Sequence, residues 1–390
     1  MRALLTTAIL ALATPALGQS IPCGGSWSGF MNDVATEARA LGLSRSAINA
    51  VTGHASQSQS VLRIDRAQGV FKQTFLEFSK RALSSYRLNK WAENYPRYRS
   101  VFDRAQREYG VQPEVIGAFW ALETDFGAVQ GDFNTISAIA TLAHDCRRPE
   151  LFQPQLFAAI ELLGHGDISL DTTGAWAGEI GMVQMLPEDI LHRGVDGDGD
   201  GHVRLKTSAP DAIMSAASMI KSLGWRANEP WLQEVTVPDG FPWERSGFGN
   251  GMSVAEFERH GVRAREGALP GGRMQAELLL PQGRFGPKFL AYPNYRVYLE
   301  WNQSFVYTLT AGYMATRLGG ATRYAEGNPE TGLDDAQMKR LQTILQSRGY
   351  DVGDIDGILG GGTRAAVQAE QLRMGLPADA WPTPGLLARY

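Results

Sequence analysis

The chain has 390 residues, of which 44% are hydrophobic and 20% charged, and its formal net charge is −4. This length allows two or three globular domains with a substantial core. The mild excess of acidic residues argues against nucleic acid as a partner, because nucleic acid is gripped largely through Lys and Arg contacts to phosphate.

The N-terminus has the pattern of a secretory signal peptide. Arg2 supplies a positive charge, residues 3–13 are almost wholly apolar, and Ala16-Leu17-Gly18 fits a small-residue cleavage site. We predict that residues 1–18 are removed and that the mature protein is soluble and works in the periplasm or cell envelope. No later run approaches the roughly 20 apolar residues of a transmembrane helix.

Two cysteines follow the signal peptide, Cys23 and Cys146. Pro22 directly before Cys23 argues against a lipid anchor, since a lipid-acceptor cysteine normally stands at the cleavage point after a small residue. In an oxidising compartment two cysteines most often pair. We therefore expect a Cys23–Cys146 disulfide that ties the N-terminal segment to the core.

The segments between residues 19 and 164 are predicted to be helical. Residues 61–90 carry Phe71, Phe75 and Phe78 at helical spacing and are expected to form an amphipathic helix. Pro113 opens a further helix, because proline fits the first helical turn without losing a hydrogen bond. Two more helices are expected at 134–146 and 154–164.

Glu123 stands at the end of the helix that Pro113 opens. Ile116, Phe119 and Glu123 fall on one helical face. A carboxylate that ends an apolar stripe must be paired or must stay protonated with a raised pKa. A protonated glutamate among apolar side chains suits a general acid aimed at a glycosidic oxygen. The alternative is a solvated glutamate near a helix end.

The second half of the chain changes character several times. Residues 174–187 are rich in glycine and contain Trp176 and Gln184. Helices are expected at 212–223 and 304–318. Residues 231–300 are richer in Gly, Pro and β-formers and predict a small β-containing subdomain inserted into a helical domain of residues 19–325. A linker at 326–332 and a compact helical unit at 333–390 complete the chain.

An acidic loop follows the glycine-rich segment. Asp196, Asp198 and Asp200 alternate with glycines in the spacing of a calcium-binding EF-hand loop, in which His202 would supply its backbone carbonyl. Thr207 stands where the loop normally has a closing glutamate, so Asp211 is the nearest carboxylate able to close the site. The spacing predicts a structural Ca²⁺ site; a solvated acidic turn is the alternative.

Three blocks in this order resemble the lytic murein transglycosylases of the membrane-bound B type. They are YGVQPEVIGAFWALETDFG (109–127), GAWAGEIGMVQMLP (174–187) and EWNQSFVYTLTAGYMATRLGG (300–320). The family's single catalytic acid aligns on Glu123 and its sugar-binding glutamine on Gln184. In the third block Trp301 replaces a tyrosine, while Asn302, Ser304 and Tyr307 match.

The resemblance implies a lysozyme-like helical domain that acts on glycan strands of peptidoglycan. Glu123 would cleave the MurNAc–GlcNAc bond without water, leaving 1,6-anhydro ends. Gln184 and Asn302 would bind the sugar amides, Tyr307 would line the cleft, and Trp176 would stack on the sugar or pack. A hydrolytic muramidase and a catalytically silent wall-binding scaffold are the competing hypotheses.

The chain departs from the family pattern at two positions near the cleft. Ala175 stands where serine is frequent, so a hydroxyl contact is lost. Glu179 stands where alanine is common, and it is either a structural or secondary substrate contact or a second carboxylate for a hydrolytic path. Asp125, two positions from Glu123, is expected to point elsewhere as a capping or surface residue.

Residues 333–390 resemble a peptidoglycan-binding type 1 module, a small three-helix domain. Asp334 is predicted to cap the first helix of this module, and Met338, Leu341 and Leu345 to form its core stripe. Two residues depart from the pattern: Glu370 stands where an aromatic side chain is usual, and Ala380 where glycine is usual.

Overall fold

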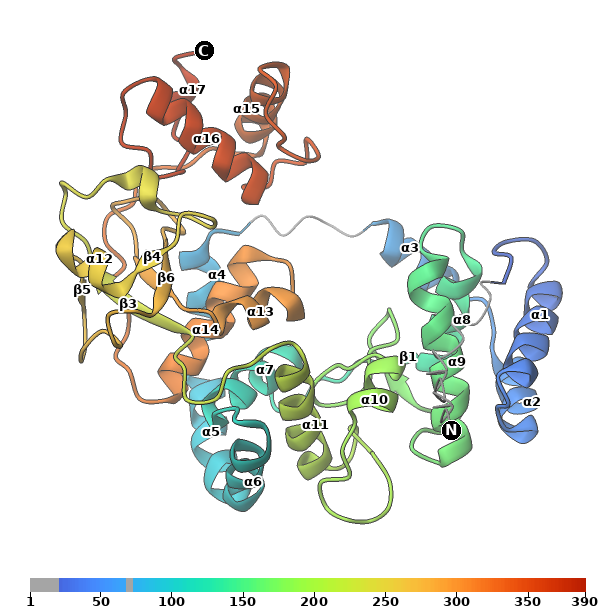
Figure 1. Ribbon diagram of the computed structural model, residues 1–390. Coiled ribbons are helices and arrows are strands. Elements are labelled where there is room, and N and C mark those ends of the chain that lie inside the picture. The colour runs from blue at the N-terminus through green and yellow to red at the C-terminus, as the bar shows by residue number, and fades with distance from the viewer. Residues whose placement is uncertain (1–20, 68–72) are drawn as a thin grey trace, which may run out of the picture.

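The computed structural model describes residues 21–67 and 73–390, and Figure 1 labels its elements. The predicted signal peptide and Phe71 lie outside the described residues. The chain is mainly helical, with one small β-containing subdomain and three helices at the C-terminus. This arrangement confirms the predicted α+β class.

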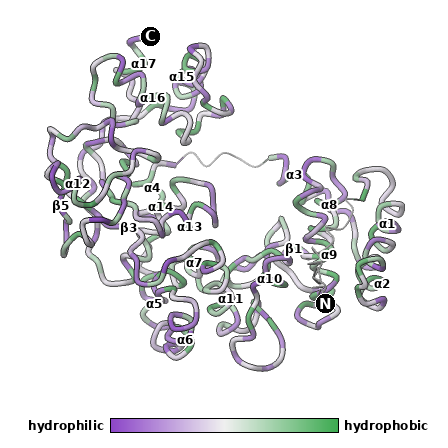
Figure 2. Tube along the Cα trace, in the orientation of Figure 1, coloured by the Kyte–Doolittle hydropathy of each residue, from purple (hydrophilic) through white to green (hydrophobic). Residues whose placement is uncertain are grey.

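One group of helices, which includes the first helices of the described chain, forms one side of the molecule (Figure 1). A disulfide between Cys23 and Cys146, with the Cα atoms 5.3 Å apart, joins the first described residues to the segment after α8. Hydrophobic residues gather on the inner helices (Figure 2), and every residue of α8 is buried. The members are α1 (Trp27–Ala40), α2 (Arg45–His54), α3 (Gln59–Arg66), α8 (Thr135–His144) and α9 (Pro149–His165).

A second group of helices packs around α7, which contacts α5, α6, α11 and α14. Helix α7 (Pro113–Thr124) begins at Pro113, as predicted, and Ile116 and Phe119 are fully buried. The others are α4 (Phe75–Ala82), α5 (Ser85–Arg97), α6 (Arg99–Tyr109), α10 (Pro187–Arg193), α11 (Ala209–Ser222), α13 (Tyr295–Trp301) and α14 (Phe305–Leu318). Strands β1 (Phe133–Asn134) and β2 (Thr173–Gly174) pair between the two groups.

The prediction of one amphipathic helix across 61–90 was wrong. The described part of this stretch contains the end of α3, the whole of α4 and the start of α5. Thr74 and Glu77 form a capping box at the start of α4, and the Ser84 hydroxyl caps α5. These side chains satisfy backbone N–H groups that a continuous helix would have used, so each opens a new helix.

The predicted insertion contains a five-stranded antiparallel sheet in the order β4-β6-β7-β3-β5. Its own small core includes Phe257, Leu278 and Leu290. The last part of the range that we read as β-forming is instead helix α13. The elements are β3 (Leu232–Thr236), the 3₁₀ turn Trp243–Arg245, β4 (Met252–Ser253), α12 (Val254–Arg259), β5 (Arg263–Ala264), β6 (Gln275–Leu279) and β7 (Phe289–Ala291).

Three helices form the C-terminal unit: α15 (Asp335–Ser347), α16 (Gly361–Arg373) and α17 (Pro384–Leu387). The Asp334 carboxylate accepts the Gln337 N–H and so caps α15, as predicted. Met338, Leu341 and Leu345 lie in this unit's core. Ala380 has φ +60°, a left-handed conformation that glycine adopts without steric cost. The backbone therefore accounts for the glycine that is usual there.

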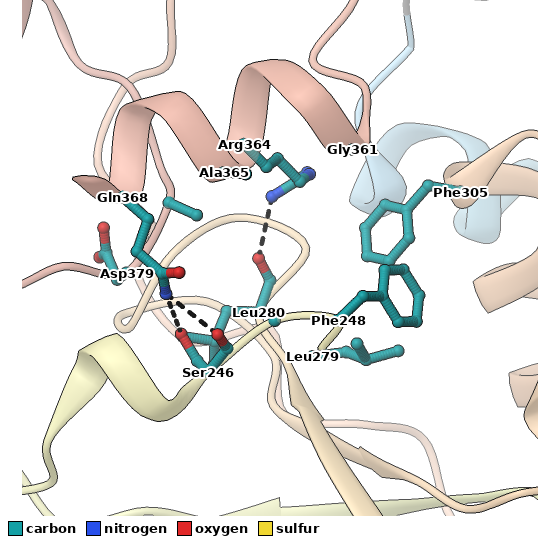
Figure 3. Close-up of a pocket in the computed structure, with 12 residues that line it drawn as sticks. Ser246, Phe248, Leu279, Leu280, Phe305, Gly361, Arg364, Ala365, Gln368 and Asp379 are labelled. Carbon is teal, nitrogen blue, oxygen red and sulfur yellow. Dashed lines mark hydrogen bonds between the residues drawn. The ribbon is translucent and has the colours of Figure 1, made fainter. Parts of the chain in front are cut away.

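The C-terminal unit is fixed to the β-containing subdomain (Figure 3). The Arg364 guanidinium donates to the carbonyl oxygens of Leu280 and Pro281, and the Gln368 amide donates to that of Ser246 at 3.0 Å. The segment predicted as a linker, 326–332, has no helix or strand but is anchored, because the Trp381 indole donates to the Glu330 carbonyl at 2.9 Å. Within the described ranges, no helix is long and apolar enough to cross a membrane.

Candidate active site

Glu123 lies at the inner wall of a cleft of about 460 Å³. Helix α7 carries it there, while the glycine-rich segment, α10 and the end of α13 supply the other walls. Most of the lining side chains are polar or acidic, which suits a hydrated ligand such as a sugar more than an apolar one. The lining residues are Glu123, Ala175, Glu179, Gln184, Met185, Leu186, Asp189, Met219, Glu300, Trp301 and Asn302.

Two donors hold one oxygen of the Glu123 carboxyl group. The Trp301 indole Nε1 donates to Oε1 at 3.0 Å, and the Tyr307 hydroxyl donates to the same oxygen. The Trp301 ring stacks on Phe119 of α7, with the centroids 4.3 Å apart. Trp301 thus keeps a hydrogen-bond donor where the family pattern has tyrosine.

Burial dominates the electrostatics of Glu123. Desolvation raises its pKa, the hydrogen bonds from Tyr307 and Trp301 lower it, and the charge of Glu179 raises it again. Burial also raises the pKa of Tyr307 well above its usual value, so this hydroxyl stays protonated and donates. The net direction for Glu123 is upward, which favours the neutral acid.

The structure brings Gln184 and Asn302 to the same cleft. The Gln184 side-chain nitrogen donates to the carbonyl oxygens of Gly181 (2.8 Å) and Gln130 (3.3 Å). The Asn302 side-chain oxygen accepts the Ser304 N–H at 2.8 Å. Among the described residues, the protein bonds only the nitrogen of the Gln184 amide and only the oxygen of the Asn302 amide. The Gln184 oxygen and the Asn302 nitrogen can therefore bind a ligand.

Trp176 and Tyr307 are partly buried, pack against the main hydrophobic core and are not among the residues that line this cavity. For Trp176, packing was one of the two roles expected. The Tyr307 hydroxyl donates to Glu123 Oε1. Asp125 ends α7 in a left-handed conformation and pairs with Arg87 at 2.6 Å, as expected of a capping residue.

The acidic character of the cleft was only partly foreseen. Glu179 was singled out as a departure, but Asp189 and Glu300 also line the cavity. Burial raises the pKa of Glu179 and of Asp189. Asp189 follows the second family block by two positions and Glu300 directly precedes Trp301, so their proximity to the blocks was the available signal.

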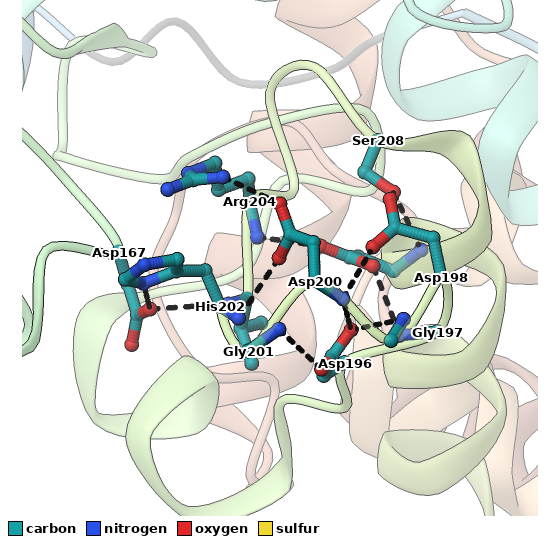
Figure 4. A network of polar contacts seen from close by, with 12 residues as sticks. Asp167, Asp196, Gly197, Asp198, Asp200, Gly201, His202, Arg204 and Ser208 are labelled. Carbon is teal, nitrogen blue, oxygen red and sulfur yellow. Dashed lines mark hydrogen bonds and ion pairs between the residues drawn. The ribbon is translucent and has the colours of Figure 1, made fainter.

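Three of the four predicted carboxylates come together at the acidic loop, whose polar contacts are drawn in Figure 4. Oxygens of Asp196, Asp198 and Asp211 lie within 4.8 Å of one another. Asp200 is not in this group, because its carboxylate accepts from the Arg204 guanidinium at 2.5 Å and from the His202 N–H at 2.9 Å. The His202 ring contacts Asp167 instead of the loop centre, with Nδ1 and Oδ1 3.1 Å apart.

Asp211 gives the loop its fit to a cation. It is 1% exposed, and its two oxygens accept the N–H groups of Gly197 and Arg204 at 2.9 and 2.7 Å. In the described part of the chain no Lys, Arg or His pairs with it. A buried carboxylate without a cation is costly, and carboxylate oxygens are the ligands that Ca²⁺ prefers. The donor set therefore fits a hard divalent cation.

Comparison with known proteins identifies the family to which this domain belongs. Residues 26–316 match the family model described as a transglycosylase SLT domain. The chain belongs to this transglycosylase family. Residues 334–389 match a model of a peptidoglycan-binding domain. The resemblance drawn from the three sequence blocks is therefore confirmed at the level of the family.

This transglycosylase is similar to proteins from two bacteria. Membrane-bound lytic murein transglycosylase B of Escherichia coli is 27% identical over 281 residues, 69% of this chain and 76% of the relative. SltB3 from Pseudomonas aeruginosa, solved in complex with NAG-anhNAM-pentapeptide, is 33% identical with a TM-score of 0.86, and the match covers 94% of this chain and 99% of SltB3.

A third relative bears on the acidic loop. The E. coli lytic transglycosylase Slt35, solved in complex with calcium, has a TM-score of 0.65 and 25% identity, and the match covers 76% of this chain and 95% of Slt35. Calcium is thus found in a structure similar to this one.

Proposed function

We propose that this transglycosylase cleaves the β-1,4 bond between MurNAc and GlcNAc in peptidoglycan and leaves 1,6-anhydro-MurNAc ends. Family membership and the similarity to SltB3, which was solved with NAG-anhNAM-pentapeptide, support the substrate class. The predicted signal peptide and the family support action in the periplasm, with residues 333–390 binding the wall.

The observation that supports the mechanism is that only one oxygen of the Glu123 carboxyl group receives hydrogen bonds from the described protein. Both donors, the Trp301 indole and the Tyr307 hydroxyl, bond to Oε1. Within the described chain Oε2 makes no hydrogen bond. A neutral carboxyl group has one proton, and an oxygen that already accepts two donors is a poor place for it. The proton therefore sits on Oε2, where substrate can take it.

A single acid is sufficient because the substrate supplies its own nucleophile. Glu123 protonates the glycosidic oxygen as the bond from this oxygen to C1 of MurNAc breaks. The resulting carboxylate accepts the proton of the MurNAc C6 hydroxyl, whose oxygen bonds to C1 and closes the anhydro ring. A hydrolytic glycosidase instead needs a second carboxyl at a set distance.

Gln184 and Asn302 would position the sugars by complementary contacts. The free Gln184 oxygen can accept an acetamido N–H, and the free Asn302 nitrogen can donate to an acetamido carbonyl. Tyr307 and Trp301 both donate to Glu123 and are positioning residues for it, and Trp301 also lines the cleft. Trp176 then has a packing role.

Product analysis tests the reaction type. Digestion of purified peptidoglycan by the full-length protein is expected to yield muropeptides with anhydro ends, which mass spectrometry distinguishes from hydrolysed ends heavier by one water. Predominantly hydrolysed ends would instead identify a muramidase, with Glu179 or Asp189 as the second carboxyl. Binding without any cleavage would identify a wall-binding scaffold.

We also propose that Asp196, Asp198 and Asp211 hold a structural Ca²⁺ through their carboxylate oxygens, and that the positive charge of the ion balances the buried Asp211 carboxylate. For a dissociation constant on the order of 10⁻⁴–10⁻³ M, 10 mM Ca²⁺ is expected to stabilise the fold by about 1.4–2.7 kcal/mol. Calorimetry should show a Tm increase of about 2–4 °C.

A matched pair of variants makes the calcium test specific. Asp198→Ala is expected to abolish the Ca²⁺-dependent increase in Tm, whereas Asp239→Ala, which removes an exposed carboxylate outside the loop, should keep it. An unchanged Tm of the wild-type protein in Ca²⁺ relative to EDTA would exclude the site.

A further inference from the structure

Glu179 is a cleft residue that the single-acid mechanism does not use. It lies in the glycine-rich segment between β2 and α10 and lines the same cavity as Glu123, Gln184 and Asn302. Its charge acts on Glu123, so the two carboxyl groups are electrostatic neighbours. The single-acid mechanism does not explain why a carboxyl group stands at this position of the cleft wall.

The Glu179 carboxyl group is incompletely satisfied by the protein. Backbone N–H groups of Glu179 itself and Ala177 interact with it. Its Oε2 is buried and has no hydrogen-bond partner among the described residues. A buried polar atom left without a partner is destabilising, so a hydrogen-bond donor on a ligand in the cleft would stabilise this oxygen.

A structural ion pair does not account for this oxygen. The positive charge that acts on Glu179 is that of Arg148. This guanidinium pairs with the buried Asp65 and stacks on Phe152, with its Cζ 5.1 Å from the ring centroid. Glu179 forms no ion pair within the described residues, so a salt bridge is not its role.

We propose that Glu179 is a substrate-binding residue that hydrogen-bonds a hydroxyl or acetamido group of the amino sugar bound beside Glu123. This inference rests on the proposed function and extends it by naming a specificity-determining contact. A sugar presents hydroxyl and N–H donors at close spacing, whereas an apolar ligand would leave the oxygen unpaired. The raised pKa of Glu179 also allows the neutral acid to donate to an acetamido carbonyl.

Binding measurements on an inactive background test this contact. Isothermal titration of the NAG–NAM disaccharide without peptide compares the full-length Glu123→Gln protein with the Glu123→Gln/Glu179→Ala protein. Loss of a hydrogen bond to a buried carboxyl is expected to weaken binding about tenfold. Glu123→Gln/Glu179→Gln, which keeps a hydrogen-bonding side chain, should lose less affinity.

Two controls make the result decisive. Glu123→Gln/Glu93→Ala removes an exposed carboxylate of α5 and is expected to bind as the background does. Thermal unfolding of each variant shows whether it is folded; a misfolded Ala variant leaves the Gln variant as the test. Equal affinity with and without the Glu179 carboxyl overturns the contact but leaves the proposed reaction intact. Failure of the disaccharide to bind the Glu123→Gln protein would overturn both.

Discussion

Replacing Glu123 by Gln is expected to reduce the release of muropeptides from peptidoglycan by about 10³-fold or more, since a positioned general acid contributes about 10²–10⁴ and here acts twice in the cycle. The substituted amide keeps an oxygen that can accept from Trp301 and Tyr307, so the geometry of the cleft is retained. It lacks the acidic proton. Rate measurement by chromatography of released muropeptides gives the magnitude.

Stability distinguishes loss of chemistry from loss of folding in this variant. Because burial raises the pKa of Glu123, the folded state binds the proton more tightly than the unfolded state does. Stability then falls as pH rises from the unfolded pKa toward the folded one. At neutral pH the Glu123→Gln protein is therefore expected to have a Tm equal to or above that of the wild type.

Asp125→Asn is the matched control for Glu123→Gln. It changes the other carboxyl group at the end of α7, which pairs with Arg87 and does not line the cleft. This variant should retain most of the activity. Comparable activity of the Glu123→Gln protein and the wild type would remove Glu123 from the mechanism.

Local patterns predicted the parts of the site that depend on local geometry. The 3.6-residue period placed Glu123 at the end of a buried helical face, and the alternation of Asp and Gly placed Asp196 and Asp198 in one turn. Both features need only the conformation of a short segment. The missing glutamate at Thr207 also pointed correctly to Asp211 as the nearest carboxylate, and this residue joins the cluster.

Contacts between distant segments could not be predicted in the same way. The donors to Glu123, Trp301 and Tyr307, stand 178 and 184 residues further along the chain. The periodicity of a sequence does not show which side chains of one helix will contact a carboxyl group on another. Tyr307 was therefore expected to line the cleft, and its hydrogen bond to Glu123 was not predicted. Asp200 likewise fits the loop spacing, yet its carboxylate forms an ion pair with Arg204, four residues further along the chain.

The helix expected across 61–90 failed for a different reason. Our interpretation relied on the aromatic residues at helical spacing and overlooked the helix-capping residues between them. Thr74 with Glu77 is a capping box that was readable from the sequence, as was Ser84 before α5. Here the structure followed a local signal that the hydrophobic pattern had obscured.

Glu370 provides the second large expected effect, on the stability of the C-terminal unit. It stands where the module's pattern has an aromatic side chain, and it is only 1% exposed. Arg373 donates to both of its oxygens, at 3.1 and 2.8 Å, and the Tyr350 and Tyr390 hydroxyls donate at 2.8 and 3.0 Å. Arg348 lies 3.3 Å away. The carboxylate thus joins α16, the end of α15 and the last residue of the chain.

Glu370→Ala is expected to destabilise the C-terminal unit by about 1–3 kcal/mol, because it removes the buried acceptor that two partly exposed arginines and two partly buried tyrosine hydroxyls share. Hydrogen exchange of peptides from α15 and α16 in the full-length protein measures the change locally. Asp354→Ala, which removes an exposed carboxylate of the same unit, should leave exchange unchanged. Equal protection in the Glu370→Ala and wild-type proteins would show that the network is not stabilising.

The pH dependence of the same network has a defined sign. The hydrogen bonds from Arg373, followed by those from the tyrosines and the charge of Arg348, outweigh burial and lower the pKa of Glu370 to about 2. The folded state therefore releases this proton more readily than the unfolded chain, whose glutamate pKa is about 4.3. The stabilisation is fully present above about pH 5 and is lost as pH falls toward 2. In wild-type protein the protection factors of α15 and α16, which are corrected for the intrinsic pH dependence of amide exchange, should fall over this range, whereas in Glu370→Gln, which cannot titrate, they should change less.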